Sequence, residues 1–126
     1  MSDWKELLRL EDVDVDGAIS RFANKEERYI KYLRLFLQDN NYELMNKYIA
    51  EGDVNKAFER CHAFKGVVGN LGFKSMYTVI YDVCELLRAG KIEGVEALVD
   101  EIRDNYDSII EIICNNLLWL IIKILF

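Results

Sequence analysis

The side chains best suited to chemistry lie in one stretch, residues 61–72, which holds the only histidine of the 126-residue chain. His62 is followed by Lys65 three positions on, and by Gly66 and Gly69 four and seven positions on. An imidazole in water is mostly uncharged at neutral pH, and its free nitrogen is a nucleophile. Phosphoryl transfer needs in-line access and charge neutralisation more than acid–base machinery. An accessible histidine with an ammonium group beside it therefore suits a phosphoryl acceptor.

A helix is predicted to position these residues. Asp53 is a good helix N-cap and Gly72 a good C-terminal stop, so we expect a helix over residues 54–70. Its apolar residues recur at steps of three and four, as in a helix packed within a bundle; they are Val54, Ala57, Cys61, Phe64, Val68 and Leu71. At about 100° per residue, His62 points roughly 135° away from this apolar face, toward solvent.

The two glycines share the face of the histidine, within about 40° of it. Glycine inside a helix costs roughly 1 kcal/mol relative to alanine, so Gly66 and Gly69 are not explained by a need for a helix alone. They leave bare backbone beside His62, where a partner could approach. Lys65, one turn along, can bring its ammonium to an anion held on the ring. A solvated histidine without a role is the alternative that residue chemistry leaves open.

The run His62-x-x-Lys65-Gly66-x-x-x-x-Leu71-Gly72 resembles the signature of histidine-containing phosphotransfer (HPt) domains. The similarity covers roughly residues 11–115, with further matching segments at 12–22, 29–36, 52–53 and 86–90. The resemblance implies that His62 takes a phosphoryl group from a receiver-domain aspartate and passes it to another receiver domain in two-component signalling. It also implies that Lys65 steadies the phosphoryl oxygens and that Gly66 clears the docking face.

The same resemblance implies partners and excludes some chemistry. The expected partners are response regulator receiver domains and a hybrid histidine kinase. The receiver brings the aspartate and the divalent metal, so the chain itself is expected to need no cofactor and no metal. It carries no glycine-rich nucleotide loop. We therefore expect a phosphoryl carrier without autonomous kinase activity.

Two features depart from the family pattern. Val67 and Val68 stand where small or hydroxyl residues are usual, and Val67 flanks the apolar face, where it could simply pack. Many members also carry an acidic residue or glutamine on the next helix that can reach the imidazole. The corresponding position here is Cys84, with Glu85 beside it. What orients the His62 ring is therefore open at this point.

Composition predicts one compact domain that binds neither nucleic acid nor an anionic membrane surface. Hydrophobic residues make up 52% of the chain, which is enough to fill a core, and proline is absent, which suits uninterrupted helices. The net charge of −6 and the absence of a basic stripe argue against polyanionic partners. An odd count of three cysteines and no signal peptide favour a reducing cytoplasm. Cys61 and Cys84 fall near apolar faces and read as small core residues.

We predict an all-α fold over residues 1–116, an antiparallel up-down-up-down four-helix bundle with a short N-terminal helix. A short amphipathic lead covers residues 1–11 and a short helix residues 16–23. A long helix capped by Asn24 starts at Lys25 and continues past a kink near residues 39–41 to Ile49. After the helix at 54–70, two more are expected, at 74–89 and from Ile92 to about Ile113.

Residues 12–17, Asp-Val-Asp-Val-Asp-Gly, mimic the first half of an EF-hand calcium loop. The twelfth position of such a loop should be a bidentate glutamate, but here it is Ala23. The preferred interpretation is a turn that caps the short helix.

The tail, residues 117–126, is apolar all round except for Lys123, and it is too short to span a bilayer, which takes about 20 such residues. We expect it to pair with the same surface of a second copy as a homodimer. The alternatives are that it folds back over the bundle, lies at a membrane interface, or is an artefact of the gene boundary.

Two other function classes compete with the carrier. One is a non-transferring helical interaction module that binds a receiver domain or itself. The other is a helical enzyme with its own chemistry, for which one histidine and no paired inward carboxylates give little support.

Overall fold

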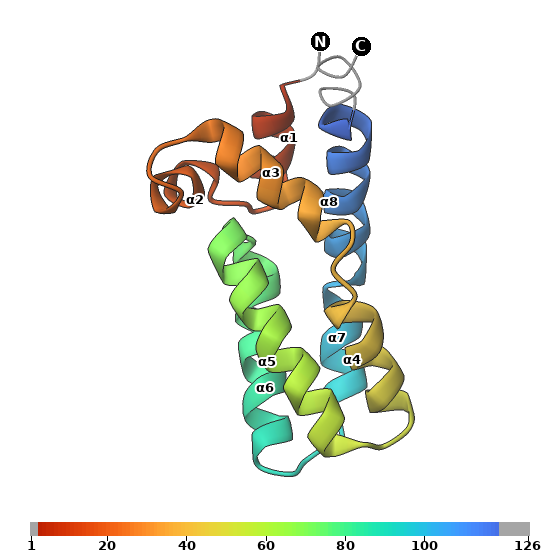
Figure 1. The fold of residues 1–126 in the computed structure, drawn as a ribbon. Helices are drawn as coiled ribbons and strands as arrows, with labels where there is room; N and C mark the ends of the chain where they lie inside the picture. Colours follow the sequence, from red (N-terminus) through yellow and green to blue (C-terminus); the bar gives the residue numbers. More distant parts are fainter. Residues whose placement is uncertain (1–2, 119–126) are drawn as a thin grey trace.

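The computed structural model describes residues 3–118, and within that range every regular element is a helix (Figure 1). The eight helices are α1 (Trp4–Leu10), α2 (Val15–Arg21), α3 (Glu26–Phe36), α4 (Asn41–Ala50), α5 (Val54–Leu71), α6 (Lys74–Arg88), α7 (Val95–Glu101) and α8 (Arg103–Asn116). This confirms the all-α prediction.

The helices form the expected antiparallel four-helix bundle. We call its four long units rods, and two of the four are each made of two consecutive helices. The first rod is α3 followed by α4, the second is α5, the third is α6, and the fourth is α7 followed by α8 (Figure 1). α5 packs against α4 on one side and α6 on the other, while α1 and α2 close the end of the bundle near α3 and α8. The helix that carries the histidine is therefore supported along its whole length.

The first rod is broken, not kinked, and its start differs from the prediction. The Asp39 carboxylate accepts hydrogen bonds from the backbone amide of Asn41 at 2.9 Å and from its side-chain amide at 3.3 Å. Such local bonds compete with the helical ladder and end it. Asn24 is not the N-cap of α3; it has a left-handed φ of 58°, and Lys25 takes the cap position.

The fourth rod also starts later than predicted. Gly94 has a φ of +80°, which no helix accommodates, so α7 begins at Val95 and not at Ile92. The rod is interrupted again at Ile102, which ends α7 and precedes α8 at φ −102° and ψ 0°. Ile102 is itself buried, so the interruption lies against the core.

The predicted apolar face of α5 lies in the core. Five of its six residues are buried, namely Ala57, Cys61, Phe64, Val68 and Leu71, and Val54 is half-buried. Phe64 joins an aromatic cluster with Phe36, Tyr42 and Tyr106, in which the rings of Tyr42 and Tyr106 stack with centroids 3.9 Å apart. This packing sets the rotation of α5 about its axis, and hence the direction of its opposite face.

The aspartates of residues 12–17 serve as caps and ion pairs. Asp14 caps α2 by accepting from the Gly17 amide at 3.1 Å. Asp12 accepts from the Ser75 hydroxyl at 2.6 Å and pairs with Lys74 at 3.3 Å. The Ser75 hydrogen bond, with the Lys74 ammonium, lowers the pKa of the Asp12 carboxyl. The segment thus forms the predicted turn and cap, and it ties the start of α2 to the start of α6.

The predicted boundary between bundle and tail is not the boundary of the core. Leu117 is fully buried, while Leu118 is exposed. The remainder of the tail, with the expected homodimer contact, lies outside the described residues and stays a prediction. No helix in the described part of the chain is long and apolar enough to cross a membrane.

A buried hydrogen bond joins α3 to the end of α5. The Tyr29 side chain is fully buried, and its hydroxyl donates to the Leu71 carbonyl at 2.8 Å. Burial raises the pKa of the Tyr29 phenol well above its ordinary value, so the hydroxyl stays a neutral donor. We expect Tyr29→Phe to lower the free energy of unfolding by about 1–2 kcal/mol, because it leaves a buried carbonyl without its donor. Urea unfolding followed by circular dichroism measures this.

Tyr32→Phe is the matched control, since Tyr32 lies on the same helix but is 45% exposed. It should change the free energy of unfolding by less than about 0.5 kcal/mol. Equal losses for the two variants would contradict the role given to the Tyr29 hydroxyl.

Candidate functional site

Two well-formed caps hold α5, the helix that presents the site. At its start the Asp53 carboxylate accepts from the Lys56 amide at 3.1 Å. At its end Gly72 takes a left-handed φ of 81°, and a Cβ added there would lie 2.6 Å from the Asp14 carbonyl oxygen. Only glycine fits both the conformation and the close approach. Both predicted caps are confirmed.

His62 lies at the middle of α5 with its ring exposed to solvent. Among the described residues, its one ring contact is with Phe58, one turn earlier, with centroids 5.8 Å apart and planes inclined by 22°. Within residues 3–118 no group makes a hydrogen bond or ion pair with the imidazole. The ring is therefore accessible, and both of its nitrogens are open to a partner.

Lys65 lies on the side of His62 that faces α6. Its Nζ is 5.2 Å from the centroid of the Tyr81 ring, a cation–π contact between α5 and α6. Tyr81 is 46% exposed, and the Lys65 side chain is itself half-buried. This contact keeps the ammonium near the histidine face without tying it to a carboxylate.

The two glycines of the motif have different surroundings. A Cβ added to Gly66 would meet nothing within 4 Å, so the backbone beside His62 is open there. A Cβ added to Gly69 would lie 3.2 Å from two carbons of the Tyr77 ring. Gly69 therefore lets Tyr77 of α6 lie close to the α5 backbone, where the sequence predicted an open face like that of Gly66.

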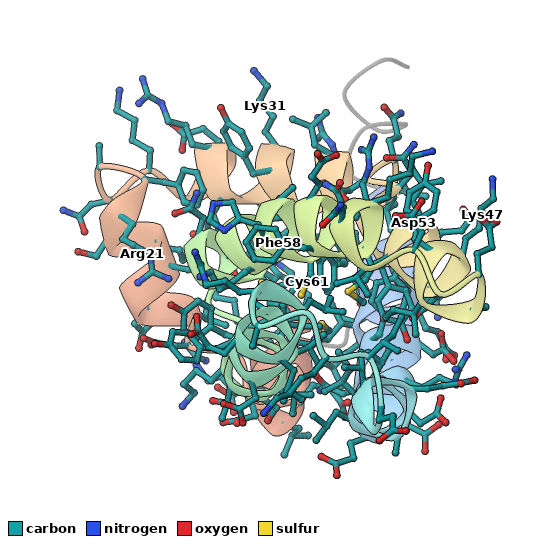
Figure 2. All side chains as sticks on the ribbon, turned by 90° about the horizontal axis from the view of Figure 1, so that it is seen from below. Arg21, Lys31, Lys47, Asp53, Phe58 and Cys61 are labelled. Atoms are coloured by element: carbon teal, nitrogen blue, oxygen red, sulfur yellow. The ribbon has the colours of Figure 1, made fainter. Side chains whose placement is uncertain are left out.

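The position expected to orient the imidazole faces inward. Cys84 is fully buried, with its Sγ 3.2 Å from Sγ of Cys61, between α5 and α6; Figure 2 shows Cys61 on the inner side of α5. The hydrogen bond with Cys84, together with burial, raises the pKa of the Cys61 thiol, so it stays protonated. The neighbouring Glu85 pairs with Arg88 at 3.5 Å. Neither Cys84 nor Glu85 makes a hydrogen bond or ion pair with His62.

The two valines that depart from the family pattern both serve packing. Val68 is fully buried, and Val67 is half-buried and packed against the core. Neither adds bulk to the face that carries His62 and Gly66.

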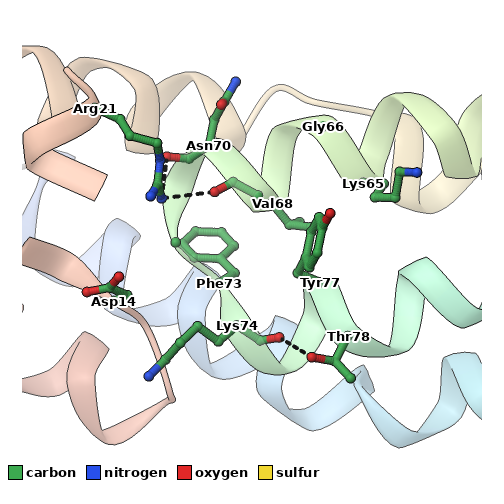
Figure 3. Close-up of a pocket in the computed structure, with 12 residues that line it drawn as sticks. Asp14, Arg21, Lys65, Gly66, Val68, Asn70, Phe73, Lys74, Tyr77 and Thr78 are labelled. Atoms are coloured by element: carbon green, nitrogen blue, oxygen red, sulfur yellow. Dashed lines mark hydrogen bonds between the residues drawn. The ribbon is translucent and has the colours of Figure 1, made fainter. Parts of the chain in front are cut away.

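A pocket of about 630 Å³ flanks this face, and Lys65 and Gly66 are among the residues that line it (Figure 3). Its wall includes Tyr77 and Arg21, whose guanidinium donates to the carbonyls of Gly69 at 3.0 Å and Asn70 at 3.3 Å. Its other lining residues are Asp14, Val68, Gly72, Phe73, Lys74 and Thr78. The lining holds three cations and one carboxylate, and with Lys74 paired to Asp12, Arg21 and Lys65 still outnumber Asp14, so the pocket is locally positive although the chain carries a net charge of −6.

Comparison with known families gives one finding that decides the family. The model of the Hpt domain matches residues 31–112, which is well over half of the chain and includes the whole histidine helix. The chain belongs to the Hpt domain family. No curated protein and no solved structure matches it.

Membership links this Hpt domain to histidine phosphotransfer in two-component signalling, in which such domains generally act as phosphocarriers that work with receiver domains and kinases. The matched residues begin within α3, so the similarity expected from residue 11 onward is found over a shorter range. In this Hpt domain α1 and α2 lie outside the matched residues.

Sequence reasoning missed three side chains at the site of this Hpt domain. Phe58 could have been found, because residues four apart on a helix lie on the same face. Tyr81 and Arg88 could not have been found from the sequence, because their positions relative to His62 depend on how α6 is aligned against α5. No local pattern specifies that alignment.

Proposed function

We propose that His62 accepts a phosphoryl group from the aspartate of one receiver domain and passes it to the aspartate of another. The observation that carries the proposal is an exposed imidazole with open backbone at Gly66 one turn along. A second domain can approach this face closely enough for in-line transfer, which is the main requirement of the reaction.

The transfer needs little from this chain beyond the histidine. The unprotonated ring nitrogen attacks phosphorus, the bond to the aspartyl oxygen breaks, and the aspartate leaves as a carboxylate. The reverse sequence hands the group to the next receiver. Lys65 lies one turn from His62 and offsets the charge of the phosphoryl oxygens. The receiver supplies the divalent metal, so this chain acts as a carrier without cofactor or autonomous kinase activity.

The partners we propose are response regulator receiver domains and a hybrid histidine kinase, in the cytoplasm. The pocket beside the site supports this assignment, because its positive lining suits the acidic surroundings of a receiver aspartate. Its volume leaves room for a side chain of the partner next to Lys65 and Gly66.

A non-transferring interaction module is the second candidate. It draws support from the exposed rings of Tyr77 and Tyr81, which would contact any docked domain. One experiment separates the two. The protein is mixed with a receiver carrying radiolabelled phosphate, and the two are separated by size. A carrier becomes labelled, whereas a module elutes with the receiver and takes no label.

Lys65→Ala should slow transfer roughly tenfold at an unchanged fold, because one charge-assisted contact to the phosphoryl oxygens is lost. Single-turnover transfer from a labelled receiver measures the rate, and circular dichroism checks the fold.

Lys56→Ala is the matched control. Lys56 also lies on α5 and also lies over a tyrosine, with its Nζ 5.6 Å from the Tyr48 ring centroid, but it is six residues before the histidine. It should leave the rate unchanged. A wild-type rate for Lys65→Ala would show that its ammonium has no part in the transfer.

A further inference from the structure

The His62 ring has no hydrogen-bonding partner among the described residues, but another aromatic ring packs against its face. Phe58 lies one turn before it on α5 and stacks against it, with centroids 5.8 Å apart and planes 22° from parallel. Offset, nearly parallel stacking is a favoured arrangement of aromatic rings. It limits rotation of the imidazole about the bond that joins it to Cβ.

Phe58 is itself held from two sides. It is half-buried and packs against the core at its base. On α6, the Cζ atom of Arg88 lies 5.0 Å from its ring centroid, and Arg88 pairs in turn with Glu85 at 3.5 Å. A cation over an aromatic ring is attracted by the ring's electrons. The core on one side and Arg88 of α6 on the other therefore hold the Phe58 ring, and that ring holds the histidine.

We propose that Phe58 is the positioning residue of the phosphoryl-accepting histidine, in place of a hydrogen bond from α6. This inference rests on the proposed function and names the group that prepares His62 for it. The position from which many family members supply such a bond holds Cys84 here, and its thiol points into the core toward Cys61. Stacking fills that role by a different contact.

Stacking on Phe58 is compatible with phosphoryl transfer, because it occupies the face of the His62 ring and leaves the edge of that ring accessible. Both nitrogens lie on the edge, and a bond from nitrogen to phosphorus lies in the ring plane. The imidazole can therefore stack on Phe58 both before and after it takes the phosphoryl group. Because the ring plane is set in advance, less motion has to be frozen at the moment of transfer.

The test compares Phe58→Leu, which keeps an apolar side chain but removes the ring, with Phe58→Tyr, which keeps the ring. His62 is the only histidine, so its ring protons give isolated NMR signals. Stacking should shift these signals upfield in the wild type and in Phe58→Tyr. In Phe58→Leu they should move to the positions of a free imidazole.

Transfer kinetics form the second arm of the test. Phe58→Leu should lower the transfer rate at saturating receiver about two- to tenfold, with the half-saturating receiver concentration unchanged, and Phe58→Tyr should restore it. Circular dichroism confirms that both variants are folded.

Three results would overturn the inference in different ways. Identical ring-proton positions in wild type and Phe58→Leu would disprove the stack. A shifted signal with an unchanged maximal rate, or with a change only in half-saturation, would disprove the positioning role. A shifted signal in a wild-type protein that takes no phosphoryl group would instead refute the proposed function, and the positioning role with it.

Discussion

His62→Gln takes up no phosphoryl group from a labelled receiver domain, while its helix content and unfolding midpoint stay close to those of the wild type. The variant loses the only imidazole of the chain, and the glutamine amide is not a nucleophile for phosphorus. The fold is spared because His62 is exposed and makes no hydrogen bond to the described residues, and such surface changes stay within about 0.5 kcal/mol. Radiolabel on the variant, resolved by gel after single-turnover mixing, is the measurement.

Glu59→Gln is the matched control, since Glu59 is an exposed residue of the same helix and receives the same new side chain. It should be labelled as fast as the wild type. Acid-labile label on His62→Gln would place the phosphoryl group on another residue and defeat the assignment.

Substitution of Gly66 should separate stability from function. A Cβ at Gly66 meets no atom within 4 Å, so nothing in this fold opposes a side chain there. Gly66→Ala should raise the free energy of unfolding by about 1 kcal/mol, the usual gain from replacing glycine inside a helix. Gly66→Gln should also fold well. It should nevertheless slow transfer roughly 10- to 100-fold, because its side chain occupies the space through which the receiver approaches His62.

The control for Gly66→Gln is Ala50→Gln, which adds the same side chain at an exposed position in the last turn of α4. Its transfer rate should match that of the wild type. A Gly66→Gln protein that transfers at full speed would mean that the open backbone has no part in docking. Lower stability of Gly66→Ala would mean that the glycine is required by the fold.

The histidine helix could be predicted from the sequence because everything that defines it is local. Asp53, Gly72 and an apolar residue at every third or fourth position specify where α5 begins, where it ends and which face it buries. The exposure of His62 follows from the same periodicity. The absence of bulk at Gly66 follows from residue type alone.

The breaks in the first and fourth rods were harder to predict. The first rod is broken between α3 and α4, where Asp39 bonds to Asn41, and apolar periodicity does not indicate this break. Because Gly94 has a positive φ, α7 begins only after it, at Val95. Gly66, by contrast, lies inside α5 with ordinary helical geometry. A glycine in the sequence does not state which of these two conformations it adopts.

The surroundings of the histidine depend on tertiary alignment. Whether Cys84 or Tyr81 faces the site is decided by the rotation of α6 against α5. That rotation is set by how the buried faces of the two helices pack against each other, and Cys61 and Cys84 are in contact there. The family resemblance suggested the position of an orienting group, but this chain holds a thiol there and turns it inward.

The carrier role of His62 is tested most directly by the path of a phosphoryl group through the wild-type protein. A labelled receiver domain is mixed with the protein, a second unlabelled receiver is added later, and the label is followed on all three chains over time. We expect an acid-labile label that appears on this chain at His62 and then moves to the second receiver. A chain that binds the first receiver but never carries label, or carries it on another residue, would show that His62 is not a phosphoryl carrier.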